Sequence, residues 1–160
     1  MPKAIICDAD VLIDYLDSNK RIFPKISKQI CVVYIPLPIL SEVKQLVGVE
    51  AKKLGLIIFE PTLKQVTEAS QRGGPLSFED KICLIMARDE RWACVTNDRN
   101  LRKKCREEGV DVMWGFDLML LLNQKGELSK KEAQDTANKI RTNNPYIKVE
   151  TLSEFTKKLK

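Results

Sequence analysis

The stretch AIICDADVLIDYL, residues 4–16, shows the pattern that the rest of the chain repeats. It opens with a short aliphatic run, residues 4–7, of the kind found in buried strands. Residues 11–16 then carry apolar side chains at helical spacing. A buried strand followed directly by a helix is typical of an α/β fold with parallel strands.

The same alternation continues along the chain. A helix at residues 39–47 is expected to stop at Gly48, and the prolines at 36 and 38 are expected to close the strand before it. The repeated order favours a three-layer α/β/α architecture, with a central, mostly parallel sheet covered by helices on both faces. The remaining expected strands are residues 30–35, 56–59, 93–96 and 110–113, and the remaining helices are 62–71, 77–88 and 99–108.

The last third of the sequence changes character. An apolar run at 116–122 and a break at 124–126 precede two expected helices, 129–141 and 152–159. The first of these helices begins with a capping box, Ser129 with Glu132. Because 160 residues suffice for one hydrophobic core, we expect a single domain, residues 1–160. Its core would cover about 3–122, with a helical C-terminal extension at about 127–160.

Composition excludes several classes of chemistry. The chain has no histidine, so Ser-His-Asp and Cys-His catalysis, histidine-based RNA cleavage and zinc sites that need imidazole are all excluded. With 44% hydrophobic residues the chain is not disordered. A net charge of +5, from 27 basic and 22 acidic residues, is compatible with a polyanionic partner and does not require one.

The five cysteines form no CxxC pair and mostly lie among aliphatic residues. This usage predicts buried, reduced thiols in a cytosolic protein. The N-terminus lacks an apolar region of signal-peptide length, and the longest apolar runs are too short to span a membrane. A cytoplasmic location with no membrane association is therefore expected.

Two acidic residues lie at the ends of expected strands. Asp8 follows the first strand, and Asp98 follows the strand at 93–96. In an open parallel sheet, ligands gather at the carboxyl ends of the strands. Asp8 and Asp98 are therefore expected to converge on one cleft.

Two further acids occupy helices. Glu42 lies in the expected helix 39–47, on a face shared with Ile39 and Leu46, and Asp80 opens an otherwise apolar helix. Carboxylates drawn together repel one another unless a cation neutralises them. Oxygen ligands without histidine indicate a hard cation, Mg²⁺ or Mn²⁺.

Each acid also has a purely structural interpretation. Asp8 or Asp10 could cap the first helix, and Asp98 could cap the helix that follows it. Ser77 and Asp80 form a capping-box pattern. Capping does not account for Glu42 on an apolar helix face.

Four ordered segments resemble the PIN-domain nucleases over roughly residues 3–122: IICDADVLIDYL, PILSEVKQL, LSFEDKICLIMAR and CVTNDRNLRKKC. The resemblance implies an Mg²⁺- or Mn²⁺-dependent endoribonuclease that leaves a 5′-phosphate and a 3′-hydroxyl. By the same resemblance Thr96 orients a water beside the metal. The residues that it assigns as metal ligands are Asp8, Asp80, Asp98 and, directly or through water, Glu42.

The sequence departs from this family at two positions: Asn100 stands where many relatives have a further acid, and Ala9 where Thr or Ser is usual. Asn100 leaves open whether one or two metal ions bind. Asp10, where relatives often have Asn or Ser, could replace part of the missing charge or cap the first helix, and the cap is favoured. The helical tail resembles that of small VapC-like toxins and their stand-alone relatives, which implies an antitoxin protein as a partner of a toxin. Homodimers are common among these relatives, and the apolar run DLMLLL, residues 117–122, is available either for an interface or for the core.

A basic row follows Asp98. Arg99, Arg102 and Arg106 lie at helical spacing, as a groove that binds the backbone of RNA would require. A solvated helix face is the alternative. No stacking aromatic stands out, and Tyr15, Phe78 and Trp114 are expected in the core.

Two other functions remain open at this point. The segment IICDADVL also resembles the opening motif of haloacid-dehalogenase-type phosphatases, in which the first aspartate is the nucleophile, but a later GDxxxD motif is missing. A non-catalytic PIN-like module that binds RNA or protein is the second alternative.

Overall fold

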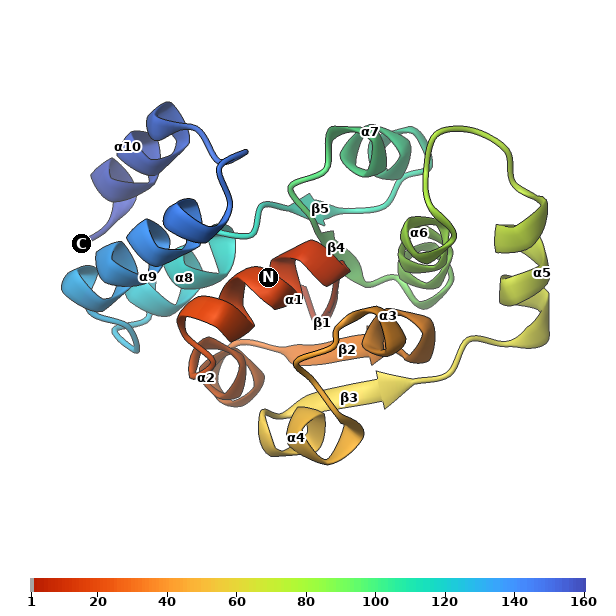
Figure 1. Cartoon of the computed structure of the whole chain (residues 1–160), viewed down its shortest axis with the longest axis horizontal. Helices are drawn as coiled ribbons and strands as arrows, with labels where there is room; N and C mark the ends of the chain where they lie inside the picture. The colour runs from red at the N-terminus through yellow and green to blue at the C-terminus, as the bar shows by residue number, and fades with distance from the viewer. Residues whose placement is uncertain (1) are drawn as a thin grey trace.

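In the computed structural model, which describes residues 2–160, the chain is built around a five-stranded sheet. All the strand pairs are parallel, in the order β3-β2-β1-β4-β5 (Figure 1). The expected three-layer α/β/α fold with a parallel central sheet is confirmed. The strands are β1 (Ala4–Cys7), β2 (Val32–Pro36), β3 (Leu56–Phe59), β4 (Ala93–Val95) and β5 (Val112–Met113).

The chain leaves β1 toward β2 and β3, and then returns to place β4 on the other side of β1. Helix α2 packs on β2 and β3, whereas α6 packs on β1 and β4. Right-handed crossovers therefore place the helices before β3 on one face, and α6 and α7 on the other. The helices are α1 (Ala9–Ser18), α2 (Ile22–Gln29), α3 (Leu37–Glu42), α4 (Gly48–Lys53), α5 (Leu63–Gln71), α6 (Phe78–Glu90), α7 (Arg99–Glu107), α8 (Asp117–Gln124), α9 (Lys130–Asn143) and α10 (Val149–Lys158).

This topology has a switch point between β1 and β4. The connections that follow these two neighbouring strands run to opposite sides of the sheet, which opens a crevice at their carboxyl ends. Asp8 begins the connection after β1, and its backbone N–H donates to the carbonyl of Val95, the last residue of β4 (3.2 Å). The fold therefore brings the segment around Asp8 to the end of β4.

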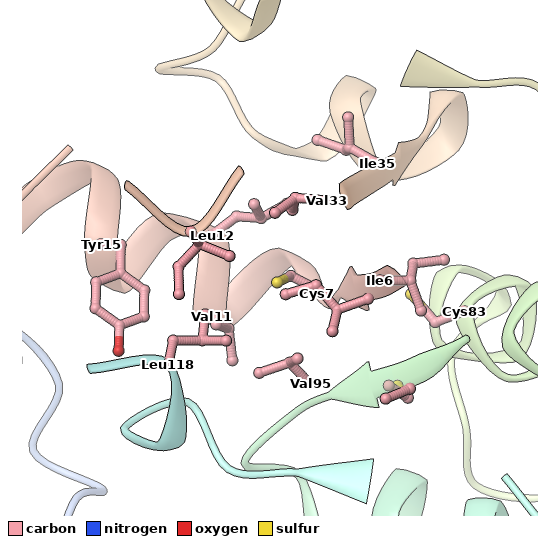
Figure 2. Packing of buried hydrophobic residues seen from close by; sticks show 14 of the residues in the cluster. Ile6, Cys7, Val11, Leu12, Tyr15, Val33, Ile35, Cys83, Val95 and Leu118 are labelled. Atoms are coloured by element: carbon pink, nitrogen blue, oxygen red, sulfur yellow. The ribbon is translucent and has the colours of Figure 1, made fainter. Parts of the chain in front are cut away.

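The core lies between the sheet and its helices. Figure 2 shows the side chains of Cys7 and Val33 on the side of the sheet toward Leu12 of α1, and Ile6 beside Cys83 of α6. Tyr15 is also in the core, as expected, and its hydroxyl donates to the carbonyl of Gly115 at 2.5 Å. The cysteines are all free and buried, so the expectation of buried thiols is confirmed.

The prediction of a helix at residues 39–47 is wrong for the second half of that segment. Helix α3 ends at Glu42, and Gly48 begins α4 rather than ending a helix. Val43 and Leu46 are both buried, and the chain leaves the helix to place them in the core. Tertiary packing therefore overrides the helical pattern, and Leu46 does not share a helix face with Glu42.

Helix α2 is absent from the sequence prediction. Its segment IFPKISKQ carries Pro24 in the first turn, a position where the missing N–H of proline costs nothing. Ile22, Phe23 and Ile26 form its buried face. The apolar spacing of this segment supports a helix, but the proline within it argued against predicting one.

The C-terminal helices pack against the rest of the chain. Helix α9 contacts α1 and α8, and α10 contacts α9 (Figure 1). The Ser129 hydroxyl accepts from the N–H of Glu132 (3.1 Å), as the capping pattern predicts. Leu118, Met119 and Leu122 of the DLMLLL run are buried within the chain, so the core takes the larger part of that run. Among residues 2–160, none of the helices is both long enough and apolar enough to cross a membrane.

Candidate active site

The carboxylate of Asp8 sits at the switch point and is almost completely buried, with 3% of its surface exposed. Asp8 is the N-cap of α1, because its Oδ1 accepts from the N–H of Val11 (2.9 Å). Its Oδ2 accepts a hydrogen bond from the hydroxyl of Thr96. Thr96 directly follows β4 and is fully buried, so one carboxylate oxygen of Asp8 is held by the first turn of α1 and the other by the end of β4.

Asp98 joins the same network. Its backbone N–H donates to Oγ1 of Thr96 (3.0 Å), and its carboxylate caps α7 by accepting from the N–H of Leu101 (2.8 Å). Asp8 and Asp98 therefore each cap a helix and also take part in the hydrogen-bond network at the strand ends. The expectation that Asp10 caps α1 is wrong: Asp10 lies in the first turn and is free to face the crevice.

Asp80 and Glu42 reach this region from α6 and α3. The N–H of Asp80 donates to the hydroxyl of Ser77 (3.1 Å), which fixes the start of α6. Burial and then the negative charge of Asp98 raise the pKa of Asp80. Burial, followed by Glu79 and Asp80, raises the pKa of Glu42 to about 7. The negative charges of neighbouring acids therefore raise the pKa values of both Asp80 and Glu42.

The acids form one negatively charged group, called here the acid cluster. Burial raises the pKa of Asp8 to about 7, against hydrogen bonds from Thr96 and Val11 that lower it. Within residues 2–160, no lysine or arginine forms an ion pair with any member. The cluster thus combines mutual repulsion with desolvation and has no cation of its own. Its members are Asp8, Asp10, Glu42, Glu79, Asp80 and Asp98.

The donor set of the cluster fits a hard divalent cation. It offers carboxylate oxygens, while burial and neighbouring negative charge keep the thiols of Cys7 and Cys83 protonated by raising their pKa. In the described part of the chain, no three acidic or cysteine side chains converge closely enough to coordinate one ion as they stand. Mg²⁺ keeps several waters and is commonly held by one or two carboxylates, so a convergent trio is not a requirement.

A hollow of about 380 Å³ opens beside the cluster. We call it the acidic hollow. It also contains Asp14, whose pKa burial raises to about 6 although Asn144 donates a hydrogen bond to its carboxylate (3.3 Å). The lining residues are Asp8, Asp10, Ile13, Asp14, Asn97, Asp98 and residues 143–146.

Asp14 and Glu79 also lie at this site and were not predicted there from the sequence. Asp10 and Asp14 are four residues apart and share a face of α1, and Glu79 is adjacent to Asp80. Both signals were present in the sequence. These two signals indicate a shared site only once the structure shows that α1 and α6 lie around the crevice.

The expected basic row divides into two parts. Arg99 and Arg106 are exposed, whereas Arg102 is 4% exposed and donates from Nη1 to the carbonyl of Thr96 (3.1 Å). The guanidinium carbon of Arg102 lies 3.5 Å from the ring centroid of Trp114, a cation–π contact. Trp114 is 46% exposed, so the expectation that it lies in the core is wrong. Phe78 is partly buried against the core.

Comparison with known proteins supports the fold. No protein-family model and no curated protein matches the sequence. A PilT N-terminus domain protein from the hyperthermophilic archaeon Sulfolobus solfataricus P2 superposes with a TM-score of 0.54 at 15% identity, covering 72% of this chain and 89% of that one. The VapBC2 structure from Rickettsia felis, bound to a DNA fragment from its promoter, is also similar, with a TM-score of 0.45 at 15% identity over 69% of this chain and 98% of that one.

The chain therefore has the fold of the PilT N-terminus, or PIN, domain. This outcome confirms the fold that the four ordered segments implied. At this level of identity the comparison supports the architecture, and function has to be argued from the site itself.

Proposed function

We propose that the protein is a divalent-metal-dependent endoribonuclease whose active centre is the acid cluster at the carboxyl ends of β1 and β4. The observation that carries the proposal is the buried Asp8 carboxylate, which accepts hydrogen bonds from Thr96 and from the N–H of Val11. It lies among acids that form no ion pair with any lysine or arginine of residues 2–160. Such a concentration of negative charge costs stability unless it serves to bind a cation.

In this proposal Asp8, Asp80 and Asp98 hold Mg²⁺ or Mn²⁺, and Glu42 contributes directly or through water. When bound, the ion supplies an activated water and stabilises the negative charge that develops on the phosphate. A chain without histidine is suited to this chemistry, because no imidazole is needed to move a proton. The expected products carry a 5′-phosphate and a 3′-hydroxyl.

The residues of the chain itself fix the geometry of the centre. Thr96 donates to the carboxylate of Asp8 and accepts from the backbone N–H of Asp98, and so links these two residues at the ends of neighbouring strands. Because its hydroxyl proton is directed to Asp8, we assign Thr96 as a positioning residue for that carboxylate. Arg102 supports this arrangement from behind by donating to the carbonyl of Thr96.

The phosphatase alternative is disfavoured by the sequence. An aspartyl-phosphate phosphatase of the haloacid-dehalogenase type needs a late GDxxxD acidic pair beside its nucleophilic aspartate, and this chain has no such motif. The binding-module alternative draws support from one observation, because the acids in residues 2–160 do not form a ready-made coordinating trio. A cleavage assay separates this alternative from the enzyme.

The assay follows mixed single-stranded RNAs with increasing Mn²⁺ or Mg²⁺. We expect cleavage that depends on the ion and stops with a chelator. Asp135→Asn is a matched control, because Asp135 is exposed on α9 and pairs only with Lys131 there. Its activity should equal that of the parent. An inert protein that still binds the ion and RNA would establish the binding module instead.

We also propose that the nuclease is the toxin of a toxin–antitoxin pair and forms a homodimer. The support is the resemblance of its helical tail to that of small VapC-like proteins. A short reading frame beside the gene, whose product suppresses the cleavage, would support the toxin role. Full cleavage in the presence of that product would contradict it. The molar mass in solution tests the dimer.

A further inference from the structure

We infer that a second pocket, beside the acidic hollow, binds one nucleotide of single-stranded RNA by stacking its base on Trp114. The inference rests on the proposed function and names how that site holds its substrate. The pocket has a volume of about 290 Å³, just below the roughly 300–1,000 Å³ typical of ligand sites. Its lining residues are Asn97, Arg99, Trp114, Phe116, Tyr146, Ile147, Lys148 and Thr151.

The indole of Trp114 is a supported platform. Nearly half of this residue is exposed although Arg102 lies 3.5 Å from the ring centroid. Arg102 is buried and tied to the carbonyl of Thr96, and it does not line the pocket. The backbone N–H of Trp114 donates to the carboxylate of Asp117 (2.9 Å). The ring is therefore held in place before a ligand arrives, which lowers the entropic cost of stacking.

The charges around the ring suit a phosphate backbone. Arg99 and Lys148 line the same pocket from two separate segments, the start of α7 and the residue before α10. Neither forms an ion pair within residues 2–160. An aromatic ring combined with unpaired cations is the composition with which proteins hold single-stranded nucleic acid.

The pocket adjoins the acidic hollow. Asn97 and Tyr146 line both of them. Figure 1 shows the connection between α9 and α10, which carries Tyr146 and Lys148, turned toward β5 and α7. A nucleotide stacked on Trp114 would therefore place the next phosphate of the strand beside Asp98. The C-terminal extension closes this side of the site, and so acquires a role in substrate binding.

Tryptophan fluorescence tests the inference, because the chain has two tryptophans. Trp92 is stacked on Tyr34, with the ring centroids 4.0 Å apart, in a separate aromatic cluster. The variant Trp92→Phe reports on Trp114 alone, and Trp114→Phe reports on Trp92 alone. A short single-stranded oligoribonucleotide, titrated in chelator, should quench the first variant and leave the second unchanged.

Affinity provides the second measurement. Replacing Trp114 by alanine should weaken binding of the same oligoribonucleotide by about 5- to 150-fold, the range expected when one stacked base loses its aromatic partner. Trp114→Phe should lose less, because a ring remains. Equal quenching in the two single-tryptophan variants, or unchanged affinity in Trp114→Ala, would overturn the inference.

These measurements separate the inference from the proposed function, because neither requires cleavage. Quenching by RNA in a protein that never cleaves would preserve the stacking pocket and refute the enzyme. Normal cleavage by Trp114→Ala with an unchanged KM would refute the pocket and preserve the enzyme. Thermal unfolding of each variant checks that it is folded.

Discussion

The hydroxyl of Thr96, the residue after β4, donates to Oδ2 of Asp8, the residue after β1, and so ties together the two strand ends at the switch point of the sheet. Asp8 has 3% of its surface exposed and carries its charge among other acids. This one contact therefore bears on the stability of the fold and on the orientation of the carboxylate that the proposed chemistry needs.

We expect Thr96→Val to destabilise the protein by about 1–3 kcal/mol, the cost of leaving buried polar groups unpaired. The substitution keeps the volume but removes the bond to Asp8 and the acceptor for the N–H of Asp98. Thr96→Ser is the matched control, since it keeps the hydroxyl. Denaturant unfolding at neutral pH measures both. Equal stability of the valine variant and the parent would contradict the role of Thr96.

The metal-free protein should lose stability as the pH rises from about 4 to 7. The pKa of Asp8 is about 7 in the folded chain and 3.8 without its environment, so over this range the folded state binds more protons than the unfolded state. Glu42, whose pKa is raised from 4.5 to about 7, acts in the same direction but contributes less, because the residue is exposed and solvent screens its charge. One pKa unit corresponds to about 1.4 kcal/mol, so the total change should reach a few kcal/mol.

Unfolding in chelator at a series of pH values measures this slope, and Asp8→Asn should flatten it. The pKa values of Glu68 and Glu108 are lowered by Arg88 and Arg72, respectively. Their contribution to stability is therefore present above about pH 4.5 and disappears as the pH falls below it. A metal-free protein that becomes more stable from pH 5 to 7.5 would contradict the raised pKa values of Asp8 and Glu42, which come first from burial and then from neighbouring acids.

Mg²⁺ or Mn²⁺ should raise the melting temperature at neutral pH, because an ion that binds only the folded state stabilises it. The gain is about 2.7 kcal/mol at a hundredfold excess over Kd. Asp8→Asn should remove most of the effect, whereas the surface control Asp135→Asn should keep it. Calorimetric titration with Mn²⁺ measures the affinity directly. Unchanged Mn²⁺ binding by Asp8→Asn would remove Asp8 from the site.

Arg99 and Arg106 should contribute to RNA binding through phosphates, whereas Arg102 should act on stability. Replacing Arg99 and Arg106 by alanine should reduce the salt dependence of RNA binding by about 0.7 in log–log slope for each phosphate that is no longer neutralised. Arg102→Ala should instead destabilise the fold, because it removes the interactions with Trp114 and with the carbonyl of Thr96. Binding titrations at several salt concentrations, with unfolding curves, distinguish the two effects. An unaltered slope in the double variant would exclude these arginines from the RNA site.

The sequence was most informative where one local pattern decides the structure. Short aliphatic runs alternating with helical patterns predicted the parallel sheet, and the positions of Asp8 and Asp98 after two strands predicted the crevice between them. The N-caps at Ser77 and Ser129 were also predicted, because a capping hydroxyl acts within a few residues of its own position.

The predictions that were wrong or missing concern features that depend on contacts between distant segments of the chain. Burial of Val43 and Leu46 ends α3 early, and Arg102 leaves the exposed row because Trp114 and the carbonyl of Thr96 lie beside it. Asp14 enters the site only because α9 brings Asn144 to it. The assignment of residues 1–160 to one domain and the metal-ligand roles of the acids remain predictions.

The most direct test of the central claim is the cleavage of single-stranded RNA by the parent and by Asp98→Asn, with Mn²⁺ present and with analysis of the product ends. Asparagine preserves the cap of α7, so the variant should stay folded while its cleavage falls to the level seen with chelator. The parent should yield 5′-phosphate and 3′-hydroxyl ends. Cleavage by Asp98→Asn at the rate of the parent, or products that end in a 2′,3′-cyclic phosphate, would contradict hydrolysis at the acid cluster.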